Sequence, residues 1–201
     1  MSDRQGTLVT GFADPVLDAQ GAFRRLLDAM AHPGRAVEIA GCPPPPDGLH
    51  PASFAVALTL FDGDTPLWLS PGLRTAATEE SLRFHCGSRR VADPADAAFA
   101  IVAESDPFAI GQFDAGEERY PDRSATLVVQ VAGLAGGVPV DLSGPGIDGV
   151  ATVGPVGLPR GFWADWAANH ARYPLGIDLI LVSGAHLLAL PRSVAAQPVE
   201  A

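Results

Sequence analysis

The chain has 201 residues, of which 47% are hydrophobic and 18% charged, so it can bury a sizeable core and is neither disordered nor fibrous. Acidic residues outnumber basic ones by 23 to 13, giving a net charge of −10. This charge argues against binding nucleic acid or an anionic membrane through the overall field. Every basic residue is arginine, and the absence of lysine excludes a Walker-type phosphate loop, a Schiff base and a lysine general base.

The length predicts a single domain over residues 1–201. The proline run at 43–46 predicts an extended loop within that domain, because the roughly 41 residues before it are too few for a core of their own. The two cysteines, Cys42 and Cys86, form no C-x-x-C pair, which argues against a zinc ribbon or an iron–sulfur cluster. With no apolar signal core near the start, we expect a reduced, cytoplasmic protein.

The first predicted element is a helix over residues 14–31, which Asp14 or Asp18 caps and which ends before Pro33. Its apolar residues recur at helical spacing and predict one buried stripe. That stripe consists of Phe23, Leu26, Leu27 and Met30.

The rest of the chain alternates between apolar runs typical of strands and runs typical of helices. Helices are predicted at 52–61, 75–84 and 159–171, and strands at 37–39, 66–70, 99–102, 125–131 and 138–142, with a closing hairpin of 177–182 and 186–190. This order predicts an α/β fold with a mixed β-sheet flanked by helices.

No motif in the sequence defines a catalytic residue or a metal site. His85 and Cys86 are neighbours in the chain, so their side chains point in different directions. A thiol–imidazole dyad at Cys86 therefore needs a histidine brought in by the fold, such as His50 or His170. A structural role for Cys86 as a buried residue is favoured. The histidines show no metal-binding spacing, and no serine lies in a G-x-S-x-G frame. The turn at 143–147 is interpreted as a tight turn rather than an anion loop.

Four polar residues are candidates for anion binding or for an interface. Arg83 and His85 alternate with apolar neighbours, so an extended backbone at this point would place both side chains on one face. A cation and an imidazole on one face are suited to binding a phosphate or a carboxylate. The alternative is that the two side chains lie on a solvated face or form an ion pair with Asp or Glu. Asp178 lies in an apolar run and needs a partner, either Arg192 or a backbone turn.

Six segments, in this order between about residues 12 and 193, resemble the PhnH family of the bacterial carbon–phosphorus lyase system. They are FRRLLDAM at 23–30 with Pro33-Gly34, LTL at 58–60 with Asp62 and TPLWL at 65–69, LRFH at 82–85, SATL at 124–127, LSGPGI at 142–147, and YPLGIDLIL at 173–181 with ALPR at 189–192.

The resemblance implies a fold like the large domain of pyridoxal-phosphate-dependent transferases and a homodimer. It further implies an accessory subunit that works with the G, I and J subunits of the core complex, which forms a ribose 1-phosphonate 5-triphosphate from ATP and a phosphonate with loss of adenine. The family supplies no catalytic residue to carry over. The run Pro43–Pro46 and Cys86 depart from its pattern, which argues against a function for either.

Three functions are therefore considered. The first is a subunit of the carbon–phosphorus lyase core complex, with no cofactor, no metal, no nucleic acid and no membrane partner. The alternative is a stand-alone phosphonate- or nucleotide-binding enzyme in which Arg83, His85 and Arg192 form an anion pocket. A third possibility is a homodimeric scaffold outside any pathway.

Overall fold

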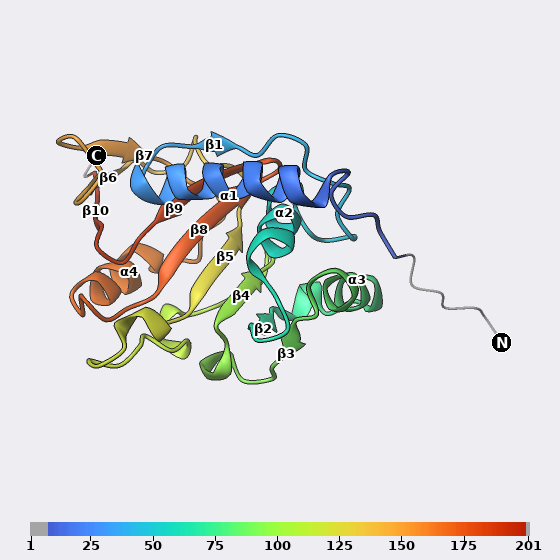
Figure 1. The fold of residues 1–201 in the computed structure, drawn as a ribbon. Coiled ribbons are helices and arrows are strands. Elements are labelled where there is room, and N and C mark those ends of the chain that lie inside the picture. The colour runs from blue at the N-terminus through green and yellow to red at the C-terminus, as the bar shows by residue number, and fades with distance from the viewer. Residues whose placement is uncertain (1–7, 200–201) are drawn as a thin grey trace.

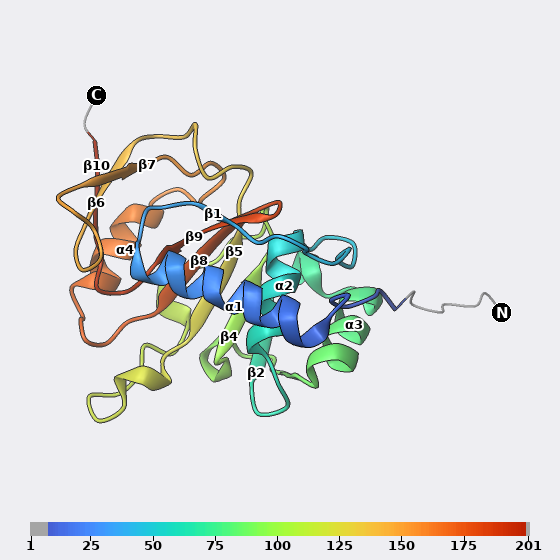
Figure 2. The same cartoon turned by 45° about the horizontal axis from the view of Figure 1, so that its top comes forward.

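The computed structural model of the chain describes residues 8–199 and confirms an α/β fold with a mixed sheet and flanking helices (Figures 1 and 2). In this part of the chain, no helix is both long and apolar enough to cross a bilayer. The α-helices are α1 (Pro15–Ala31), α2 (Pro51–Leu60), α3 (Ala76–Cys86) and α4 (Phe162–His170). The strands are β1 (Val37–Glu38), β2 (Pro66–Leu69), β3 (Arg89–Arg90), β4 (Phe99–Val102), β5 (Thr126–Gln130), β6 (Val140–Ser143), β7 (Ala151–Val153), β8 (Asp178–Ser183), β9 (His186–Leu190) and β10 (Ala195–Pro198).

Seven strands form the main sheet, in the order β1-β9-β8-β5-β4-β2-β3. The run from β8 through β5, β4 and β2 to β3 is parallel, whereas β9 is antiparallel to both β8 and β1. The predicted closing hairpin is thus confirmed as β8 and β9. A second sheet of three antiparallel strands has the order β10-β6-β7. The edge of the main sheet formed by β3 lies beside α3 (Figure 1).

Each face of the main sheet has its own apolar core. On one face, α1, α2 and α3 cover the sheet, and α2 is buried on nearly all sides, as its apolar sequence predicts. On the other face, α4 and the three-stranded sheet close the second core around the fully buried Trp166. Because side chains alternate along a strand, the apolar runs of β4, β5 and β8 supply both cores.

Helix α1 begins as predicted but buries a side that only partly matches the predicted one. The Asp14 carboxylate accepts hydrogen bonds from the backbone N–H groups of Val16 and Leu17, each at 3.0 Å. The predicted stripe is wrong in part, because Phe23 is 43% exposed and Leu27 is 51% exposed. The helix instead places small side chains against α2 and β9, and small residues allow a closer approach. Its buried residues are Ala22, Leu26 and Ala29.

The proline run at 43–46 packs with a period of three. Pro43 and Pro46 are buried, while Pro44 between them is exposed. A polyproline II helix has three residues per turn, so every third residue faces the same side. One edge of this segment therefore docks on the protein, which gives the run a packing role.

Candidate functional site

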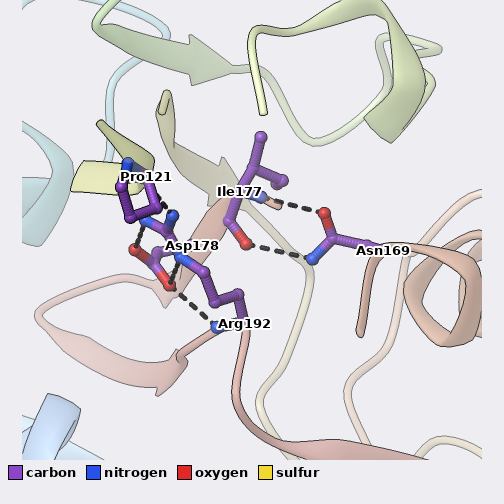
Figure 3. Close-up of polar contacts among 5 residues, drawn as sticks. All are labelled: Pro121, Asn169, Ile177, Asp178 and Arg192. Carbon is purple, nitrogen blue, oxygen red and sulfur yellow. Dashed lines mark hydrogen bonds and ion pairs between the residues drawn. The ribbon is translucent and has the colours of Figure 1, made fainter. Parts of the chain in front are cut away.

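Asp178 and Arg192 form the partly buried ion pair that the sequence suggests (Figure 3). The guanidinium donates from Nε to Asp178 Oδ1 at 3.1 Å and from Nη2 to Oδ2 at 2.5 Å, and the backbone N–H of Arg192 donates to Oδ1 at 2.8 Å. The remaining nitrogen, Nη1, donates to the carbonyl oxygen of Pro121 at 2.6 Å. All three guanidinium nitrogens are engaged, so this pair serves to join three chain segments.

A second polar pair fixes the chain just before β8. The Asn169 side chain on α4 donates to the carbonyl oxygen of Ile177 at 3.0 Å and accepts from its N–H at 2.9 Å (Figure 3). Asn169 is buried, and these two bonds satisfy both ends of its amide. Together with the Asp178–Arg192 pair, they hold the start of β8 in register.

Arg83 and His85 do not share a face. The backbone stays helical to Cys86 and ends at Gly87, which has a left-handed φ of 67°. Two residues apart on an α-helix are separated by about 200°, so the extended geometry that the anion site requires is absent at these positions. Arg83 is exposed along the groove described below, and His85 turns toward the N-terminal segment.

His85 holds that segment against α3. Its Nε2 lies 2.8 Å from the carbonyl oxygen of Val9, and its ring packs edge-on against Phe54. A Cβ added at Gly11 would lie only 3.2 Å from the ring, so glycine there permits the close approach. The contacts of His85 are those of a structural residue.

Neither cysteine is set up as a nucleophile. Burial raises the pKa of the Cys86 thiol to about 12. Burial and the nearby charge of Glu38 raise the pKa of Cys42 to about 11. With these pKa values both thiols stay protonated near neutral pH. Because the thiolate is the reactive form, both cysteines are unreactive there.

We expect iodoacetamide at pH 7.5 to alkylate both thiols at least about 100-fold more slowly than an exposed cysteine in a peptide, since each raised pKa reduces the thiolate fraction by that factor or more. The alkylation rate should rise with pH up to about pH 11 for Cys42 and up to about pH 12 for Cys86. Mass spectrometry of the time course measures it. Alkylation of either residue as fast as the peptide would show a reactive thiol.

A cavity of about 380 Å³ opens between α3 and the free edge of the main sheet. We call it the α3–β3 groove. Its floor is apolar and its rim carries charges of both signs, which is the usual make-up of a binding site. The lining residues are Leu67, Leu69, Ala76, Glu79, Glu80, Leu82, Arg83, Ser88 and Arg90.

An ion pair crosses this groove. Arg90 Nη1 on β3 lies 2.7 Å from Glu79 Oε1 on α3, and both side chains are well exposed. Sequence reasoning identified Arg83 but missed Glu79 and Arg90. The pair joins residues 11 apart whose proximity depends on the path of the chain from α3 into β3. A solvent-exposed pair of this kind contributes at most about 1 kcal/mol, so it can open when the groove is occupied.

Within residues 8–199, no group of three or more histidine, cysteine, aspartate or glutamate side chains is placed to hold a metal ion. The structure brings Asp178 and Arg192 together and separates Arg83 from His85. It also forms the α3–β3 groove, where an apolar floor and charged rim make a candidate site. These features define an α/β protein with a seven-stranded mixed sheet and a groove at one sheet edge.

Comparison with known proteins identifies the family. Residues 10–197 match the family described as "Bacterial phosphonate metabolism protein (PhnH)". The chain is 44% identical over 183 residues to the "Alpha-D-ribose 1-methylphosphonate 5-triphosphate synthase subunit PhnH" of Rhizobium meliloti, covering 90% of this chain and 92% of that protein. It is 32% identical over 174 residues to the "Putative C-P lyase subunit protein HtxG" of Stutzerimonas stutzeri, covering 87% of this chain and 83% of that protein. The chain belongs to the PhnH family.

Proposed function

We propose that the chain is an accessory subunit of a carbon–phosphorus lyase core complex and is required to form ribose 1-methylphosphonate 5-triphosphate from ATP and methylphosphonate. The observation that carries this proposal is the 44% identity to a synthase subunit over nearly the full length of both proteins. The partners are the G, I and J subunits and a second copy of this chain, in the cytoplasm. Exposed apolar side chains on α1, among them Val16, Leu17, Phe23 and Leu27, support burial of this surface in an assembly.

Co-expression with the G, I and J subunits of the same bacterium, followed by size-exclusion chromatography with light scattering, tests this assembly. The chain should elute at the mass of the complex, and a sample purified alone should elute as a dimer. If the chain always elutes separately from the other subunits, the subunit proposal is wrong.

The alternative of a stand-alone anion-binding enzyme loses support from the geometry. Arg83 and His85 point apart, and the guanidinium of Arg192 is engaged by Asp178 and Pro121. Calorimetry of the isolated chain with ATP and with methylphosphonate separates the two functions. Tight binding of either compound would favour the stand-alone enzyme.

Pyridoxal phosphate does not fit this chain as a covalently held cofactor. A Schiff base requires a primary amine, and no side chain supplies one because the sequence contains no lysine. We therefore propose that the subunit works without this cofactor. After incubation with pyridoxal phosphate and reduction with borohydride, we expect no adduct on any side chain by peptide mass spectrometry. A stoichiometric adduct within an internal peptide would contradict this expectation.

A further inference from the structure

We propose that the α3–β3 groove is a strand-addition site, in which an extended segment of a partner subunit pairs with β3 and inserts an apolar side chain beside α3. The inference rests on the proposed function, because it takes the occupant from another subunit of the complex. The segment that fits carries an apolar side chain flanked by one acidic and one basic residue.

The first support is the free edge of β3. In the described part of the chain, β3 is the last strand of the main sheet and pairs only with β2. The N–H of Val91 donates to the carbonyl oxygen of Leu67 at 2.9 Å, so Val91 faces β2. In a parallel ladder successive residues point their N–H and C=O groups to opposite sides, so those of Arg90 point to the free side. An incoming strand finds a main-chain donor and acceptor there.

The second support is the register between β2 and β3. Arg90 pairs with Leu67, and paired residues place their side chains on the same face of a sheet. That face is the one α3 covers, since Arg90 reaches Glu79 there. A residue of an added strand opposite Arg90 would point its side chain to this same face, into the cavity. The apolar floor that receives it is formed by Leu67, Leu69 and Leu82.

The third support is the charge on the rim. Glu80 and Arg83 lie one turn apart on α3, line the groove, and have no ion-pair partner within residues 8–199. The Ser88 hydroxyl is shielded from solvent and also lacks a hydrogen-bond partner in this region. An occupant with one acidic and one basic side chain complements this rim. A peptide strand supplies main-chain groups, an apolar side chain and both charges at once, which is how strand addition achieves affinity and specificity.

Two pairs of variants test the proposal through the affinity of the purified chain for the co-purified G, I and J subunits. Arg90→Pro removes the free N–H of β3, and Arg90→Ala removes the same side chain but keeps that N–H. Ala76→Trp fills the mouth of the groove at an exposed position of α3, and Ala164→Trp places the same bulk at an exposed position of α4. We expect Arg90→Pro to bind at least tenfold more weakly than Arg90→Ala, which isolates the backbone N–H from the loss of the Arg90–Glu79 pair. We expect Ala76→Trp to bind at least tenfold more weakly than Ala164→Trp, which should stay within twofold of the parent.

Hydrogen exchange of the unmodified chain supplies a readout that needs no variant. The amide of Arg90 should become protected at least tenfold in the complex, measured on a peptide spanning residues 87–92. If the parent assembles but this amide stays unprotected and both groove variants bind normally, the strand-addition site is wrong while the subunit function stands. If the parent itself does not bind the other subunits, both proposals fail.

Discussion

Replacing Asp178 by alanine is expected to lower the free energy of unfolding by about 3–5 kcal/mol. The Asp178 side chain is only 16% exposed and accepts three hydrogen bonds from Arg192, whose side chain is 14% exposed. Without Asp178, that guanidinium keeps the carbonyl of Pro121 as its sole described partner and remains a shielded, uncompensated charge. Urea unfolding of the purified chain measures the loss.

Asp64→Ala is the matched control, because Asp64 is exposed and its carboxylate makes no described contact. It should change stability by no more than about 0.5 kcal/mol. The double variant Asp178→Leu with Arg192→Met should lose less than Asp178→Ala alone, since it leaves no unpaired charge. A melting temperature for Asp178→Ala within about 1 °C of the parent would show that the pair does not stabilise the fold.

Replacing Gly146 by alanine is expected to lower the free energy of unfolding by about 2–5 kcal/mol. Gly146 has a left-handed φ of 84°, which costs other residues about 1–2 kcal/mol. It also lies against the end of α1, where an added Cβ would overlap the carbonyl oxygen of Ala31. Relieving that overlap moves the turn away from the helix, and overpacking of this kind costs about 1–3 kcal/mol more.

Gly149 provides the comparison that separates the two costs. Its φ is 72°, close to that of Gly146, but an added Cβ there meets nothing within 4 Å. Gly149→Ala should therefore cost only the backbone strain of about 1–2 kcal/mol. Equal losses in the two variants, by thermal or urea unfolding, would show that the turn does not pack against α1 as described.

Most of the architecture can be predicted from local sequence. The all-round apolar run of α2 indicates a buried helix, and the two apolar runs around Ser183-Gly184-Ala185 indicate a hairpin; both are confirmed. The predicted stripe of α1 is wrong at Phe23 and Leu27, because hydrophobicity alone favours these residues over alanine. Small residues are buried where two elements approach closely, and that distance is a property of the tertiary structure.

The candidate site is harder to predict from the sequence than the fold, for two different reasons. The shared face of Arg83 and His85 requires an extended backbone, whereas Gly87, a typical helix-ending residue, indicates a helix that includes both residues. The α3–β3 groove and the pairing of Arg90 with Glu79 depend on β3 being the sheet edge. Strand order is decided by long-range packing, so no local pattern identifies a free edge.

The most direct test of the subunit function is adenine release from ATP in the presence of methylphosphonate. The G, I and J subunits are assayed with and without this chain, at matched protein concentrations, and the chain is also assayed alone. We expect adenine and ribose 1-methylphosphonate 5-triphosphate only when the chain is present with the other three subunits. Equal product formation without the chain, or product from the chain by itself, would contradict its assignment as a required accessory subunit.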